Sequence, residues 1–108
     1  MRYEIVLSRQ AQRELNEAAD WLAERAGNPA IAEKWFTGFL QTLSSLEQMP
    51  QRCGLAREDR HFSTELRQIL YGRRQKYRAI FTIQEKRVVV LTIRRGAMSD
   101  LQPSDLED

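Results

Sequence analysis

The feature that most constrains the fold of this 108-residue chain is a helix-stop signal followed at once by a helix-start signal. Residues 9 to about 26 carry apolar side chains at helical spacing, and Gly27 can adopt the left-handed conformation that ends a helix. Asn28-Pro29 then supplies a capping amide and a proline suited to the first helical position, and a second apolar stripe runs to about Gln48. Two long helices joined by about two residues fold back as an antiparallel hairpin.

Four short strands are predicted around this hairpin. The first, Tyr3–Leu7, ends at Ser8, whose hydroxyl is suited to cap the first helix. After an irregular loop from Met49 to Ser63, three more are predicted at Glu65–Tyr71, Lys76–Ile83 and Arg87–Arg94. The last three are joined by short turns at Gly72 and at Gln84-Glu85-Lys86, which makes them an antiparallel meander.

The faces of these strands indicate how the layers pack. On the middle strand of the meander Tyr77, Ala79, Phe81 and Ile83 share an apolar face, which we expect to pack on the helices. Arg78 lies on the opposite face, which we expect to be open. The last strand is apolar on both faces from Val88 to Leu91, as in a central strand.

The predicted fold class is therefore α+β, with the order βααβββ in one domain over residues 1–108. We expect an antiparallel sheet with the N-terminal helical hairpin packed on one face. Residues 96–108, which hold four acidic and no basic side chains, are expected to be a loosely held extension.

Positive charge is concentrated in the predicted meander. The net charge is only +2, but residues 60–95 carry ten basic and two acidic side chains. Such a patch suits a polyanion, either nucleic acid or an acidic protein segment. The alternative is a solvated sheet face whose arginine stems cover apolar surface.

Several classes of site are disfavoured. Cys53 is the single cysteine and His61 the single histidine, so there is no internal disulfide and no Cys/His cluster for zinc. We expect no cofactor and no metal. No apolar run approaches the roughly 18 residues of a spanning helix, and the N-terminal run is too short for a signal peptide. We expect a cytoplasmic protein with no membrane partner.

The whole pattern resembles the RelE/ParE superfamily of toxins from type II toxin–antitoxin systems, some of which are called plasmid stabilisation proteins. The resembling segments are LSRQAQRELNEAADWLAER, NPAIAEKWFTGFLQTLSSLEQMP, ELRQILYGRRQKYRAIFTI and RVVVLTIRRGAMSDL. The most specific features are the pairs Leu66-Arg67 and Tyr77-Arg78 and the basic exit Arg94-Arg95-Gly96. The resemblance implies a growth inhibitor neutralised by a cognate antitoxin.

The superfamily has two activities, and the resemblance leaves both open. RelE-like members are endoribonucleases that cut ribosome-bound mRNA, whereas ParE-like members poison DNA gyrase. A cutting site would use Arg78 as the main phosphate contact, with Arg67 and Arg95 completing a cradle. Side chains expected to bind the target or the antitoxin are Arg73, Arg74, Lys76 and Arg94.

The sequence lacks a complete set of side chains for proton transfer at the expected site. Many RNA-cleaving relatives carry a His or Tyr at the end of the last strand, where this chain has Arg94-Arg95-Gly96. Arginine stays protonated and is a poor proton shuttle, and Lys76 is the only lysine near the expected site. This favours the ParE-like interpretation, in which nothing is cut.

Two alternatives remain: an inactive toxin homologue, or a small RNA-binding module without toxicity. The second is disfavoured because no aromatic platform is interleaved with the basic side chains of the strands. Arg67 and Arg78 also have a purely structural alternative, which is ion pairing with Glu65, Glu85 or the acidic tail.

Overall fold

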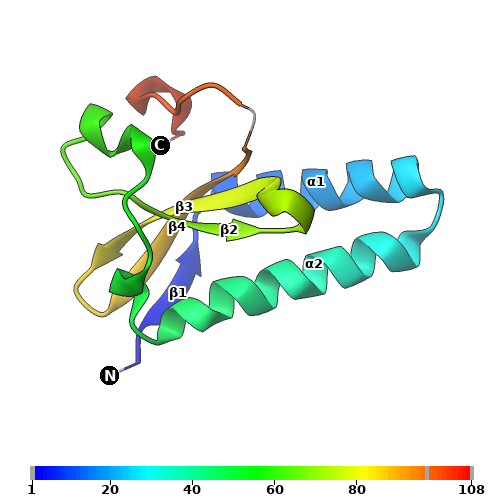
Figure 1. Cartoon of the computed structure of the whole chain (residues 1–108), viewed down its shortest axis with the longest axis horizontal. Helices are drawn as coiled ribbons and strands as arrows, with labels where there is room; N and C mark the ends of the chain where they lie inside the picture. The colour runs from blue at the N-terminus through cyan, green and yellow to red at the C-terminus, as the bar shows by residue number, and fades with distance from the viewer. Residues whose placement is uncertain (1, 97, 108) are drawn as a thin grey trace.

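A computed structural model describes residues 2–96 and 98–107, with the backbone alone at Gln75 (Figure 1). The predicted order βααβββ is confirmed. The helices and strands are β1 (Glu4–Leu7), α1 (Arg9–Ala26), α2 (Pro29–Ser44), β2 (Arg67–Tyr71), β3 (Tyr77–Gln84) and β4 (Arg87–Arg95). Short 3₁₀ turns lie at Ser45–Glu47, Pro50–Arg52, Arg57–His61, Arg73–Gln75 and Pro103–Asp105.

The helical hairpin forms where the capping signals predict it. The Ser8 hydroxyl accepts a hydrogen bond from the Ala11 amide at 3.0 Å and so caps α1. Gly27 ends α1 with φ of 63°, and the Asn28 side chain caps α2. The second helix ends at Ser44 rather than near Gln48, because the chain tightens into a 3₁₀ turn there.

The sheet has the order β1-β4-β3-β2, which places β4 inside the sheet as predicted. The expectation of a wholly antiparallel sheet was wrong, because β1 pairs with β4 in parallel. The hairpin explains this, since it returns the chain to the starting end of β1, where the Tyr3 amide donates to the Glu47 carbonyl at 2.9 Å. The next strand starts from that same end, and two further reversals leave β4 parallel to β1.

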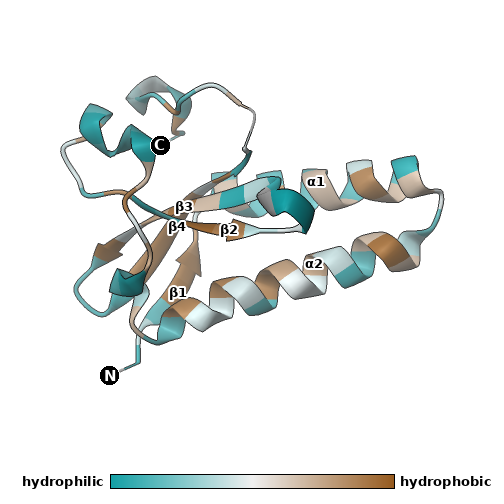
Figure 2. Cartoon of the chain, in the orientation of Figure 1, coloured by the Kyte–Doolittle hydropathy of each residue, from teal (hydrophilic) through white to brown (hydrophobic). Residues whose placement is uncertain are grey.

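One face of the sheet packs on the hairpin. The residues of this core include Leu15, Phe39, Leu43, Phe81 and Val90. Ala79 and Phe81 lie on the helix-facing side, so the predicted apolar face is confirmed. In Figure 2 the strands are mostly hydrophobic, whereas the turn that joins β2 to β3 is hydrophilic.

The other face of the sheet is covered, contrary to the expectation of an open face. The segment before β2 and the C-terminal tail lie together over it, on the side away from the hairpin (green and red in Figure 1). A second small core forms there from Ala56, Leu66, Ile80 and Leu101. The face needs this cover because Ile80 is apolar and fully buried.

The prediction of a loosely held tail was therefore wrong. Leu101 is fully buried, and Asp100 forms an ion pair with Arg57. Glu107 forms an ion pair with Arg13 on α1. An apolar anchor between charged contacts holds the tail against the domain. No helix in the described part of the chain has the length and apolar character needed to cross a membrane.

Candidate binding site at the basic end of the sheet

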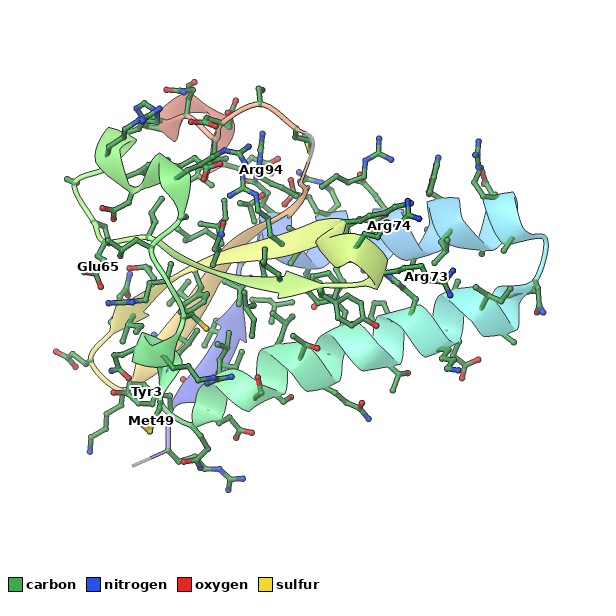
Figure 3. All side chains as sticks on the ribbon, viewed as in Figure 1. Tyr3, Met49, Glu65, Arg73, Arg74 and Arg94 are labelled. Carbon is green, nitrogen blue, oxygen red and sulfur yellow. The ribbon has the colours of Figure 1, made fainter. Side chains whose placement is uncertain are left out.

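The structure gathers five of the predicted site residues where β3 begins and β4 ends. Arg95 lies opposite Tyr77 across the two strands, and the Gly96 amide donates to the Lys76 carbonyl at 2.7 Å. Arg73 and Arg74 lie on the turn that leads into β3, at the same end of the sheet as Arg94 (Figure 3). Together with Arg25 of α1 we call this surface the basic end: Arg25, Arg73, Arg74, Lys76, Arg94 and Arg95.

Backbone geometry builds the turn that presents Arg73 and Arg74. Gly72 has φ of 93°, which favours glycine because it has no Cβ. Arg74 has φ of 59°, in the left-handed region that non-glycine residues seldom occupy. Arg73, Arg74 and Lys76 are all exposed. The turn therefore displays three cations within four positions of the chain.

Helix α1 adds an aromatic ring to the basic end. The Trp21 side chain is 44% exposed, and its ring centroid lies 5.2 Å from the Arg25 Cζ and 5.5 Å from the Arg95 Cζ. These are cation–π distances. Sequence reasoning missed Trp21 and Arg25. The available signal was an aromatic residue outside the apolar stripe of its helix, with an arginine four positions later.

A hollow of about 370 Å³ lies between α1 and the end of β4. Trp21, Tyr77, Arg94, Arg95 and Met98 contribute to its lining. Arg94 is only 7% exposed, and its Nη2 donates to the Ser99 carbonyl at 2.8 Å. The Arg94 Nε is buried and has no hydrogen-bond partner among the described residues. The Arg94 side chain lies on the same face of the sheet as Arg78, because the two residues are paired across β3 and β4, and its guanidinium is recessed there.

Two carboxylates also line the hollow, but both are engaged. Glu14 Oε1 accepts from the Thr92 hydroxyl at 2.7 Å and from the Ile93 amide at 3.0 Å. Glu14 thereby accepts from a backbone amide of β4 that lies beyond the last residue of β1 and has no described strand to pair with on that side. Glu17 forms an ion pair with Arg13 at 3.4 Å. Neither neutralises the guanidinium groups around Trp21.

The basic end has no internal counterions among residues 2–96 and 98–107. No carboxylate oxygen in these residues lies within 4.0 Å of its cationic nitrogens. Several arginines elsewhere have carboxylate partners, for example Arg2 with Glu47 and Arg87 with Glu4. Several like charges without counterions create a positive potential that attracts anions.

Arg78, expected to contact phosphate, lies under the cover of the second face. It is 2% exposed, and its guanidinium forms a bidentate ion pair with Glu58, which is fully buried. Burial by itself raises the pKa of the Glu58 carboxyl. The hydrogen bonds from Arg78 and from the Leu101 amide outweigh that effect and lower this pKa to about 2. The pair joins the loop, β3 and the tail.

Arg67 is also occupied. It forms an ion pair with Glu65 at 3.1 Å, which confirms the structural alternative for this residue. Its Nη1 also donates to the Cys53 carbonyl at 2.5 Å. Arg67 lies at the opposite end of β2 from the turn. The structure therefore does not bring Arg67, Arg78 and Arg95 together as a cradle, because two of the three hold the sheet's cover in place.

The side chains of the basic end are cations, and such a surface suits an anionic ligand. Tyr77 is half-buried, and its ring lies 5.0 Å from that of Trp35 in the core. His61 lies elsewhere, 3.7 Å from Asp100 in the cover of the second face. No group of three His, Cys, Asp or Glu residues suited to a metal ion occurs within the described ranges. The described lining supplies the Arg95 guanidinium, an indole ring and the two engaged carboxylates, and it includes no histidine.

Comparison with known proteins identifies the family. A family model described as the ParE toxin of the type II toxin–antitoxin system, parDE, matches residues 5–100. The chain belongs to the ParE toxin family. A chain of the solved structure titled "Chromosomal ParDE TA system from P. aeruginosa" is similar, with a TM-score of 0.70 and 21% sequence identity. The match covers 87% of this chain and 96% of that one. A search of the curated proteins found no significant match.

Proposed function

We propose that this ParE-family chain is a growth-inhibiting toxin that acts by binding DNA gyrase through its basic end. The observation that carries the proposal is the set of exposed cations without counterions around Trp21. Such a surface binds an anionic target and requires no proton transfer. Membership of the ParE family supports gyrase as the target.

The burial of Arg78 argues against the RelE-like activity. Cutting RNA at a phosphate needs cationic groups that reach the substrate and a pair of groups that accept and donate protons. Arg78 is committed to Glu58 beneath the tail, and Arg67 to Glu65 and the Cys53 carbonyl. The groups that would form the cutting site are therefore used as structural contacts.

Neutralisation by a cognate antitoxin is the second part of the proposal. An acidic, amphipathic antitoxin segment that covers Arg73, Arg74, Lys76 and Arg94 would remove the target surface by occupying it. The supporting observations are the exposed turn and the family membership, since a ParDE system pairs a toxin with an antitoxin. Binding energy would then come from the same cations that engage the target.

The test is controlled expression of the chain in a bacterium, alone and together with the adjacent gene. We expect growth arrest with DNA breaks or altered plasmid supercoiling, relieved by co-expression of the antitoxin. Arg74→Ala and Arg95→Ala should weaken the arrest. Arg87→Ala is the control, because it also removes an exposed arginine, but from the opposite end of β4.

Two results would contradict the proposal. Normal growth with abundant folded protein would show that the chain is not an active toxin. New transcript 5′ ends within codons, with supercoiling unchanged, would indicate RNA cutting instead. Loss of activity in Arg78→Ala would be uninformative by itself, because that variant also breaks a buried ion pair.

A further inference from the structure

The hollow beside Trp21 combines an exposed aromatic ring with guanidinium groups, which are the two features that single-stranded nucleic acids need. We propose that it binds single-stranded nucleic acid, with one unstacked base on Trp21 and the adjacent phosphates on Arg25 and Arg95. This inference goes beyond the proposed function, because it gives the same surface a second class of ligand.

Trp21 is available for stacking in a way that the other tryptophan is not. Trp35 packs edge-on against Phe39, Tyr71 and Tyr77 in the core. Trp21 is 44% exposed at the surface of α1. Stacking of one base on an aromatic side chain contributes about 1–3 kcal/mol and tolerates any base.

The guanidinium groups are placed to contact phosphates next to a stacked base. Arg25 and Arg95 come from different elements, α1 and β4, yet both lie within 5.5 Å of the Trp21 centroid. Their planar forks match phosphate oxygens, so a base that displaces a guanidinium from the ring brings its own phosphate to the freed guanidinium. Lys76 and the turn arginines continue the positive surface beyond them, along a path that a flexible backbone can follow.

The size and walls of the hollow fit one nucleotide. Its volume, about 370 Å³, lies at the lower end of the range for small-ligand sites. Met98, which is exposed, adds an apolar edge. The aromatic ring comes from a helix, so the sequence expectation of no aromatic platform among the basic side chains of the strands is not contradicted.

The exposed ring is what favours nucleic acid over an acidic protein segment. Cations alone would serve either ligand, since both are polyanions. A purely acidic segment such as poly-glutamate has no apolar side chain to place on the tryptophan ring, whereas an unstacked base gains a stacking partner. Dependence of binding on Trp21 therefore distinguishes nucleic acid from poly-glutamate.

The experiment measures binding of the full chain to labelled oligothymidylate and oligouridylate of about a dozen nucleotides by fluorescence anisotropy. We expect Trp21 fluorescence to be quenched on binding, with core Trp35 as a constant background. With about three phosphate contacts the affinity should fall with salt with a log–log slope of about −2. Trp21→Ala should weaken binding roughly 5- to 100-fold. Arg95→Ala should reduce the slope by about 0.7.

Controls separate this inference from the proposed function. Arg87→Ala should change neither the affinity nor the slope by as much, and thermal melts establish that Trp21→Ala is folded. Equal losses in Trp21→Ala and Arg87→Ala would overturn the inference, as would poly-glutamate that binds equally well and independently of Trp21. Absence of oligonucleotide binding with intact growth arrest would overturn the inference alone. Trp21-dependent binding without growth arrest would overturn the proposed function alone. The DNA and RNA probes distinguish the two sources of the strand.

Discussion

Replacing Glu58 with Gln should destabilise this domain far more than its position in an irregular loop suggests. Glu58 is fully buried and is the charged partner of Arg78, which is itself 2% exposed. Glu58→Gln keeps the shape and an acceptor for the Leu101 amide but removes the negative charge. The Arg78 guanidinium would then be a buried charge without a counterion, with only amide acceptors such as Gln68 Oε1 at 3.0 Å.

The magnitude follows from two independent arguments. Removing one member of a buried ion pair costs about 3–5 kcal/mol, and the retained hydrogen-bonding group places this variant at the lower end. The pKa of Glu58 is lowered from 4.5 to about 2, a shift that corresponds to roughly 3 kcal/mol of stabilisation by the ionised form. Both give a loss of about 3 kcal/mol near neutral pH.

Urea unfolding of both proteins across a pH series measures this effect. The stabilisation from ionised Glu58 is fully present above its unfolded pKa of about 4.5 and is lost as pH falls through the folded pKa of about 2. The difference between wild type and Glu58→Gln should therefore be about 3 kcal/mol at pH 7 and should shrink between about pH 4.5 and 2. In thermal melts, about 3 kcal/mol corresponds to a drop of roughly 13 °C for a domain of this size.

A small and pH-independent difference would refute the reasoning. A loss below about 1 kcal/mol at pH 7 is what an exposed pair would give. It would mean that the Glu58–Arg78 pair is solvated and that the tail does not seal it. A double-mutant cycle with Arg78→Met, measured by the same urea titrations, should give a coupling free energy of the same order as the single loss.

Three further substitutions test the packing. Leu101→Ala should cost about 2–4 kcal/mol in urea unfolding, because a fully buried side chain is removed, and a loss near zero would indicate a loose tail. Gly38→Ala should cost about 1–3 kcal/mol and lower the melting temperature, because a Cβ there meets the Tyr71 hydroxyl; an unchanged melting temperature would contradict this contact. Ser8→Ala should cost about 1–2 kcal/mol, because the Ser8 hydroxyl caps α1 and also donates to the Leu91 carbonyl at 3.0 Å; circular-dichroism melts would show whether that loss occurs.

The candidate site was only partly predictable. Arg73, Arg74, Lys76, Arg94 and Arg95 were expected to bind a target or phosphate, and the structure does gather them at one end of the sheet. That placement follows from the meander, whose short turn brings the start of one strand beside the end of another. Trp21, which gives the surface its aromatic character, was not predicted as a site residue, because the contact between α1 and the end of β4 cannot be read from either segment alone.

By itself the sequence determined the helical hairpin, the order of helices and strands along the chain, and the resemblance to the superfamily. Gly27, Asn28 and Pro29 act through local capping and backbone geometry, so their effect can be read without the rest of the fold. Only the tertiary structure decided what the arginines do. Arg78 forms an ion pair with Glu58, which lies in a loop 20 positions earlier in the chain. Arg95 instead lies over the ring of Trp21. Burial and charge pairing depend on which distant segments meet, and identical side chains on one sheet therefore form a buried ion pair in one place and an exposed cationic surface in another.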